Sequence, residues 1–466
     1  MQHSGLPDEF NDQPVLFGCI VSASITSRAT KVMSSDQVSH RLDFNLLEET
    51  RECPFKYFES IRHLDKPVYF MPELKAFYVS RYEDVRYIKK HPELFSNDTQ
   101  KYGTRQSVSR NIAESYRAEN GWERVSTLQR TDPPVHTKYR NLINHAFTPK
   151  RVKTMTQYIE TVVNDLIDDF IGKGQCDLMR EFAIPLPCIV IADQLGVPRD
   201  MIWDLKKWSD AMLAPGSGFT DETEALECAR QVVEAQHFFA EVIAERKVKP
   251  KDDIISTLAN TKIRDTTDGP ERNLDMYELM DMLDQLLTGG NETTTNAIGS
   301  AMMLLLQRPE EMKRLQDDPG LIRNFIEESL RFETPVMHLW RVAVEDSEIG
   351  GVAIPKGSSI AVGYASANRD EHVFADSERF DIDRRKAGAH LAFGSGPHHC
   401  PGAPLARQEM YSAFTILLHR LENLRASDPN ESFLHVPSSF LRGLAQLDLT
   451  FDVRSGDRYF PGASVY

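Results

Sequence analysis

Long amphipathic patterns occupy the middle of the chain. Apolar residues recur at helical spacing over Tyr158 to Ile171, Glu222 to Lys247 and Met276 to Leu306, and each run predicts a helix. A further helix is predicted from Asp132 toward His145, because Asp132 is a favourable N-cap and two prolines follow it in the first turn. These patterns indicate a mainly helical fold.

Strands are predicted at two places. From Lys66 the sequence KPVYFMPELKAFYVS sets two aromatic and β-branched stretches on either side of Pro72 and Glu73, which is the composition of a hairpin. Between Val342 and Val362, β-branched residues are interrupted by the turn residues of GGVAIPKGSS, so short strands are expected there. The β-sheets are therefore predicted to be small and to come mainly from the later part of the sequence.

The chain is long enough for several domains but shows no boundary between them. Its 466 residues would suit three domains of about 150 residues each. No internal repeat, low-complexity tract or glycine–serine linker divides the sequence, so residues 41–466 are interpreted as one large domain, mainly α with small β-sheets. Residues 1–40 lack a sustained period and are predicted to be a poorly ordered N-terminal extension, with Met33 a plausible natural start.

Composition and charge then narrow the classes of protein. With 41% hydrophobic and 26% charged residues, the chain has the average composition of a globular protein, which excludes disordered and collagen-like classes. The net charge of -15 disfavours a nucleic-acid binder, because phosphate recognition needs an excess of lysine and arginine.

The six cysteines lie far apart without a CxxC pair, which argues against a zinc knuckle and a disulfide-stapled secreted domain. The early apolar stretch Val15 to Ile25 is short and carries two serines, so we predict no export signal and no membrane span. A cytoplasmic location fits best.

One cysteine stands in a loop rich in glycine and proline, directly before a helical pattern that starts APLARQEM. Backbone N–H groups of such a loop, together with the positive end of the helix, stabilise a thiolate at Cys400, and a thiolate ligates iron well. Taken alone, an isolated cysteine such as Cys400 is better explained as a small buried apolar residue, as most single cysteines are.

The other residues of the loop favour the metal-ligand interpretation of Cys400, because the loop resembles the haem-binding loop of the cytochrome P450 family. The family pattern F-G-x-G-x-H-x-C-x-G is matched by Phe393, Gly394, His398, Cys400 and Gly402, with glycine also at its second fixed glycine position. The resemblance implies that these residues surround haem b (iron protoporphyrin IX) and that Cys400 is the metal ligand, whose thiolate favours O–O cleavage.

Two glycines interrupt the long helical pattern in LLTGGNETTTNA, and each costs roughly 1 kcal/mol relative to alanine in a helix. Close helix packing is one explanation, and a distorted turn beside a groove for dioxygen is the other. The segment is similar to the oxygen-binding segment of the family, G-G-x-[DE]-T-[TS]. That similarity implies that Thr293 steadies bound oxygen and its water, and that Glu292 relays protons, as the catalytic pair.

Glu328 and Arg331 are three residues apart on a predicted helix and can pair on one face. An isolated pair of this kind usually lies on the surface. The pair resembles the E-x-x-R motif of the family, which implies a buried structural network with Arg379 of the downstream SERF sequence as its third member.

Haem carries two propionates, which guanidinium groups bind well because of their planar fork. His136 and Arg140 share a helix face and match the family segment H-x-x-x-R, while Arg341 and His398 match the remaining family positions. The resemblance implies that all four contact the propionates.

The resemblance covers about Lys66 to the C-terminus and implies a soluble bacterial-type monooxygenase that inserts one oxygen atom of O2 into an organic substrate. The chain has no length for a reductase module, so electrons from NAD(P)H are expected through a separate ferredoxin and ferredoxin reductase. Ferredoxins are usually acidic, and Lys138, Arg407 and nearby cations are candidates for the docking face. Alternatives are a peroxide-driven peroxygenase or isomerase, a non-catalytic haem-thiolate ligand sensor, and a helical scaffold without cofactor; Thr293 and Glu292 speak against the first two.

Family positions also imply a substrate pocket, formed by Gln285, Thr288 and Gly289 of the long helix, by Met337 and Phe440, and by the stretch from about Ser96 to Trp122. The mixture of polar and apolar side chains predicts a small apolar molecule with a polar handle, such as a steroid, a terpenoid or a fatty acyl compound.

Overall fold

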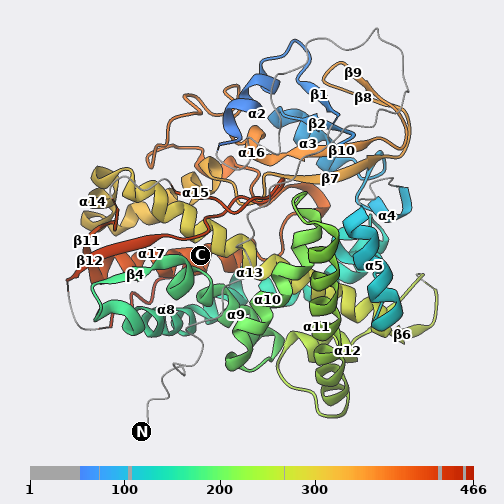
Figure 1. Ribbon diagram of the computed structural model, residues 1–466, viewed down its shortest axis with the longest axis horizontal. Helices are drawn as coiled ribbons and strands as arrows, with labels where there is room; N and C mark the ends of the chain where they lie inside the picture. The colour runs from blue at the N-terminus through green and yellow to red at the C-terminus, as the bar shows by residue number, and fades with distance from the viewer. Residues whose placement is uncertain are drawn as a thin grey trace. The chain divides into compact units, whose positions relative to one another are not determined.

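The longest helix in the described part of the chain, α13 (Met276–Leu306), runs between the other helices (Figure 1). It begins with a capping box: the Asp275 side chain accepts a hydrogen bond from the Glu278 amide, and the Glu278 carboxylate accepts one from the Asp275 amide. Most of its side chains are buried on all sides, so α13 forms the centre of the helical region.

The computed structural model describes residues 53–72, 74–102, 108–266, 268–428, 433–454 and 458–465. All of them belong to one compact unit of the chain, Asn45–Tyr466. The predicted N-terminal extension, residues 1–40, lies outside the described residues.

The long helices predicted from the sequence are confirmed, with ends that differ by one or two residues. The helix predicted from Tyr158 begins at Thr156, the one from Glu222 continues to Val248, and α13 has the predicted bounds. The helices are α2 (Phe55–Arg62), α3 (Tyr82–Lys90), α4 (Thr99–Tyr102), α5 (Val108–Asn120), α6 (Val135–Asn144), α7 (Pro149–Thr154), α8 (Thr156–Ile171), α9 (Pro185–Leu195), α10 (Ile202–Leu213), α11 (Glu222–Val248), α12 (Ile254–Asn260), α13, α14 (Pro309–Asp317), α15 (Ile322–Phe332), α16 (Tyr364–Ala367) and α17 (Ala403–Arg420).

The strands form small sheets that join distant parts of the sequence. They are β1 (Val68–Met71), β2 (Ala76–Val79), β3 (Phe95–Ser96), β4 (Gln175–Asp177), β5 (Lys262–Arg264), β6 (Glu271–Asn273), β7 (His338–Ala343), β8 (Ser347–Ile349), β9 (Val352–Ile354), β10 (Ser359–Gly363), β11 (Leu421–Ala426) and β12 (Asp448–Val453). The largest sheet has the order β1-β2-β10-β7-β3. The predicted hairpin is confirmed as the antiparallel pair β1–β2, in which Val68 faces Val79.

The prediction that strands come late is wrong for β3, β4, β5 and β6. Each has two or three residues, which is too short for an alternating pattern to show in the sequence. β3 and β4 are held by the later strands β7 and β12, so tertiary pairing decides their conformation.

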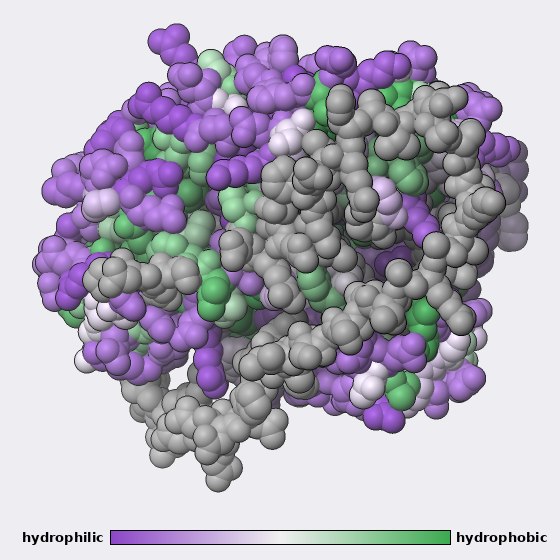
Figure 2. Space-filling view, turned by 45° about the horizontal axis from the view of Figure 1, so that its top comes forward, coloured by the Kyte–Doolittle hydropathy of each residue, from purple (hydrophilic) through white to green (hydrophobic). Residues whose placement is uncertain are grey.

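Buried apolar side chains form two clusters. The larger lies among the helices around α13, and the smaller packs α3 and α16 against the five-stranded sheet. The face shown in Figure 2 is mostly hydrophilic where it is not grey, with apolar side chains in scattered patches. Within the described ranges, no helix has both the length and the apolar character that crossing a membrane requires.

Candidate functional site

The loop that carries Cys400 is held closed by its own backbone. The Cys400 amide donates a hydrogen bond of 2.9 Å to the Phe393 carbonyl, and the Gly394 amide donates one of 2.8 Å to the carbonyl of Leu391. The 18-residue helix α17 begins at Ala403, so the thiol lies just before the positive end of a long helix.

Two glycines allow this loop to pack against the end of α3. Gly394 and Gly396 have φ values of 67° and 69°, in the left-handed region that favours glycine. A Cβ atom on Gly396 would lie only 2.4 Å from the carbonyl oxygen of Lys89, so no other residue fits there. The loop and the last turn of α3 are therefore packed backbone to backbone.

Opposing effects act on the Cys400 thiol. Burial raises its pKa, whereas the backbone N–H groups of Gly402 and Ala403 and the cations of Arg140 and Arg407 lower it. The donors that would stabilise a thiolate are thus present around the sulfur. A positively charged metal bound to the sulfur would add the stabilisation that burial removes.

Cationic and imidazole groups gather behind the loop. The rings of His136 (α6) and His398 (loop) lie 4.0 Å apart between centroids, and both His136 and Arg341 (β7) are buried. Burial and neighbouring cations lower the pKa of His136 to about 4 and that of His398 further, so both imidazoles are neutral at pH 7. The Nε2 atom of His398 is buried and has no hydrogen-bond partner within the protein. This is expected if its acceptor belongs to a bound group.

Arg140 of α6 already has hydrogen-bond partners within the protein. Its Nη1 donates to the His399 carbonyl at 2.7 Å, and its Nε donates to the Asn144 side chain at 2.7 Å. The structure therefore brings His136, His398 and Arg341 together, whereas Arg140 ties α6 to the segment beside the thiol. These donors suit a bound group with carboxylates next to a thiolate ligand, which is the chemistry of haem.

One stretch of α13 is open although the rest of the helix is buried. Between Glu278 and Leu305, the only residues that are not buried are Thr288, Gly289, Gly290, Glu292 and Thr293. We call these five residues the open stretch. It contains both residues of the predicted catalytic pair, and α13 packs against α17, the helix that follows Cys400.

The two glycines of the open stretch differ in what surrounds them. A Cβ on Gly290 would lie 3.1 Å from the Ile191 side chain of α9, so Gly290 permits close helix packing. A Cβ on Gly289 would meet nothing within 4 Å, so Gly289 borders open space. Close helix packing thus explains Gly290, whereas the distorted turn is not found, because α13 is helical throughout the segment.

Glu292 is bound to the neighbouring helix α10. Its Oε2 lies 3.0 Å from Nζ of Lys206, a buried lysine that also donates to Asp210. Burial lowers the pKa of Lys206, but the two carboxylates more than offset this and raise it overall. Burial raises the pKa of Asp210 to about 7, against the effect of Lys206.

The positions predicted to contact substrate are divided in the structure. The Gln285 amide is fully engaged, because its Nε2 donates to the Thr127 hydroxyl at 2.9 Å and its Oε1 accepts from the Gln129 amide at 2.8 Å. Thr288 donates to a carbonyl of its own helix. Met337 and Phe440 are adjacent, since the Met337 amide donates to the Phe440 carbonyl at 2.7 Å. Residues 103–107 of the predicted Ser96–Trp122 stretch lie outside the described residues.

The predicted pair of Glu328 and Arg331 is fully buried and bidentate. Arg331 Nε and Nη2 donate to the two Glu328 oxygens at 2.7 and 2.8 Å, and both side chains are 0% exposed. The remaining donor capacity of Arg331 goes to the carbonyls of Asn368, Ser377 and Arg379. A buried ion pair needs such extra hydrogen bonds to offset its desolvation.

The third member of this network is Arg384, and the prediction of Arg379 is wrong. Arg384 Nε lies 3.1 Å from each Glu328 oxygen, whereas the Arg379 side chain is exposed and only its carbonyl takes part. The path of the loop between α16 and the Cys400 loop decides which arginine points inward. The sequence signal in SERF could not distinguish them, because Arg384 follows only five residues later.

A cluster of three potential metal ligands occurs among the described residues, at Asp370, Glu371 and His372. Nη1 of Arg81 lies 2.8, 2.7 and 2.6 Å from one atom of each. The cation in this cluster is therefore a guanidinium.

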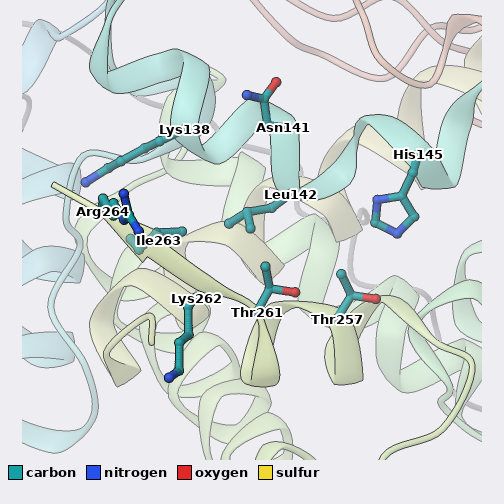
Figure 3. A pocket seen from close by; sticks show the side chains of 9 residues that line it. All are labelled: Lys138, Asn141, Leu142, His145, Thr257, Thr261, Lys262, Ile263 and Arg264. Carbon is teal, nitrogen blue, oxygen red and sulfur yellow. The ribbon is translucent and has the colours of Figure 1, made fainter. Parts of the chain in front are cut away.

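A surface groove of about 390 Å³ lies between α6 and β5 (Figure 3). It is lined by Lys138, Asn141, Leu142, His145, Thr257, Thr261, Lys262, Ile263 and Arg264. The α6 residues in it lie on a different face from His136 and Arg140, so the groove is separate from the loop site. Lys138, one predicted docking cation, is paired with Asp265 at 2.7 Å, and the other, Arg407, is paired with Glu327 at 2.6 Å.

Comparison with known proteins gives the same family as the loop. The family model for cytochrome P450 matches residues 201–319 and 320–446. The putative cytochrome P450 YjiB of Bacillus subtilis (strain 168) is 38% identical over 368 residues, which cover 78% of this chain and 86% of the relative. Linalool 8-monooxygenase of Pseudomonas putida is 32% identical over 406 residues, which cover 86% of this chain and 96% of the relative.

A solved structure agrees with these sequence relatives. CYP109E1 from Bacillus megaterium, in complex with testosterone, superposes with a TM-score of 0.73 and 30% identity, covering 87% of this chain and 99% of that one. The chain therefore belongs to the cytochrome P450 family and is a P450 monooxygenase. Membership in this family implies a haem with a cysteine thiolate ligand.

Replacing Arg384 tests the corrected network. Arg384→Ala should lower the free energy of unfolding by about 2–3 kcal/mol, because it removes a buried partner of Glu328 and donors to three carbonyls. Arg379→Ala is the matched control and should change it by less than about 0.5 kcal/mol. Unfolding in urea, followed by circular dichroism, measures both; equal losses would contradict this assignment.

Proposed function

We propose that this protein hydroxylates a small apolar organic molecule at a haem held by Cys400. The observation that carries the proposal is the open stretch of α13, in which Gly289 borders open space and Glu292 and Thr293 are only partly buried in an otherwise buried helix. When bound, the haem supplies the activation of dioxygen, and thiolate donation favours O–O cleavage. All other tasks fall to the side chains and backbone of the chain.

Cys400 supplies the thiolate, and the N–H groups of Gly402 and Ala403 stabilise its charge. Phe393 and Gly394 shape the loop that holds the sulfur. His136, His398 and Arg341 offer donors for the propionates. In this arrangement the loop and the donors together fix the position of the cofactor in the site.

Thr293 and Glu292 are proposed to guide protons. The Thr293 hydroxyl donates to the Gly289 carbonyl at 3.0 Å, which leaves its oxygen lone pairs available to accept a hydrogen bond from water in the open space. Glu292 is held by Lys206 through a charge-assisted contact of 3.0 Å, which orients its carboxylate. A proton reaching Glu292 Oε2 would pass to water held by Thr293.

The substrate is proposed to be a terpenoid, a steroid or a similar apolar compound with a polar handle. Two relatives support this, since one is a linalool 8-monooxygenase and the other binds testosterone. In this chain the half-buried Phe440 offers apolar surface, whereas Met337 beside it is only 1% exposed and the Gln285 amide is already engaged. We therefore assign an apolar contact to Phe440, and none to the Gln285 amide.

The haem assignment is tested by the absorption spectrum of the dithionite-reduced protein with carbon monoxide. Wild-type protein should give a strongly red-shifted Soret band if Cys400 holds the haem through its thiolate. Cys400→Ser should lose this band, and Cys53→Ser, at an exposed cysteine, should keep it. A wild-type protein that contains haem without this band would contradict ligation by Cys400.

The role of Thr293 is tested by the fate of reducing equivalents. Thr293→Ala should keep haem but form about tenfold less product per NAD(P)H, with the difference appearing as peroxide, because positioned proton transfer commonly contributes about 100-fold or more. Thr293→Ser, which keeps the hydroxyl, should restore most of the coupling. Unchanged coupling in Thr293→Ala would rule out the proposed role.

Electrons are proposed to come from NAD(P)H through a ferredoxin and its reductase. Docking near Cys400 would use Arg140 and the loop surface, because Lys138 and Arg407 already have carboxylate partners. Turnover with an acidic ferredoxin should fall as salt rises from low to physiological ionic strength, since screening weakens the attraction. Turnover that is independent of salt would argue against electrostatic docking.

A further inference from the structure

Lys89 is a buried lysine without a carboxylate of its own. It lies in the last turn of α3 and is 4% exposed. Among the described residues, the carboxylate that acts on it is Asp132, which is already engaged with the Ser96 hydroxyl and with the Asn97 amide at 2.9 Å. Burial, followed by the nearby Arg341, lowers the pKa of Lys89 well below its usual range. A buried ammonium without a counter-charge is costly, so an anion is expected next to it.

The side chain of Lys89 points to the haem-binding loop. A Cβ atom built on Gly394 would lie 4.0 Å from its Nζ, and Nζ lies 5.8 Å from the centre of the Tyr364 ring. Lys89 also acts electrostatically on His136 and His398, the two imidazoles behind the loop. It therefore shares a single neighbourhood with the proposed propionate donors, although it comes from a different element.

The charges of this neighbourhood do not balance within the protein. Lys89 and Arg341 are both buried cationic groups, and Asp132 is the only carboxylate that acts on either of them among the described residues. The two groups therefore share one carboxylate, which is itself engaged with Ser96 and Asn97. The propionates of a haem would supply the missing negative charge.

We propose that Lys89 is a further cofactor-binding residue, whose ammonium pairs with a haem propionate beside Arg341. The proposal rests on the proposed haem binding at Cys400. An ammonium on a flexible stem binds a carboxylate as a point charge and complements the fixed fork of Arg341. In the sequence, Lys89 and Lys90 look like two ordinary cations at a helix C-terminus, where they favour the helix dipole.

The test compares the holoenzyme with Lys89→Met and with the control Lys90→Met, at the exposed neighbour. Haem transfer to excess apomyoglobin should be about ten- to a hundredfold faster in Lys89→Met, because a charge-assisted contact is lost, and unchanged in Lys90→Met. The haem midpoint potential should become more negative only in Lys89→Met, since removing a nearby positive charge disfavours the added electron. A structural role for Lys89 alone would not predict that shift. Lys89→Gln, which keeps a polar side chain, replaces Lys89→Met if the latter does not fold.

The outcomes separate this proposal from the function on which it rests. Haem loss and midpoint potential equal to those of wild type, with a normal carbon monoxide spectrum, would overturn the role of Lys89 and leave haem binding intact. Equal effects in the Lys89 and Lys90 variants would also overturn it. Wild-type protein that takes up no haem after supplementation would instead overturn the proposed function.

Discussion

The buried ion pair of Glu328 and Arg331 is the interaction on which the thiol site depends. Arg331 donates to the carbonyl of Asn368, and the Asn368 side chain accepts a hydrogen bond from the Leu391 amide at 2.6 Å. From Leu391 the path continues through Gly394 and Phe393 to the Cys400 amide. Hydrogen bonds, together with the peptide bond between Phe393 and Gly394, thus connect α15 to the residue that carries the sulfur. Because the charges of the pair are fully desolvated, they are stable only while all of these partners remain in place.

The central helix α13 meets two conflicting requirements. A helix of 31 residues at the centre of the molecule is stabilised by burying its side chains, whereas a reaction site needs free space beside it. The chain resolves this conflict within one turn, where Gly290 packs tightly against Ile191 and Gly289 leaves a gap. The helix α13 therefore contains two adjacent residues of low helix propensity at this turn. Helix α10 holds the same turn through the ion pair of Lys206 and Glu292.

The balance of charge in the whole chain differs from the balance of charge around the Cys400 loop. The chain carries a net charge of -15, yet the neighbourhood of the loop contains more cations than carboxylates. Two other cations, Arg407 and Lys138, have carboxylate partners in Glu327 and Asp265. A local excess of buried positive charge in an acidic protein indicates a bound anion more specifically than a basic surface would.

The sequence by itself determined the features that arise from local spacing. Helix periodicity predicted α8, α11 and α13 almost to the residue, and the three-residue spacing of Glu328 and Arg331 was sufficient to pair them, because both lie on one helix. Only the tertiary structure decided which side chains from other elements meet these residues. Arg384 replaces Arg379, Lys206 reaches Glu292 and Lys89 joins the loop through contacts between distant segments, and the direction of a loop or a neighbouring helix sets such contacts. No local pattern encodes that direction, since it follows from how the whole core packs.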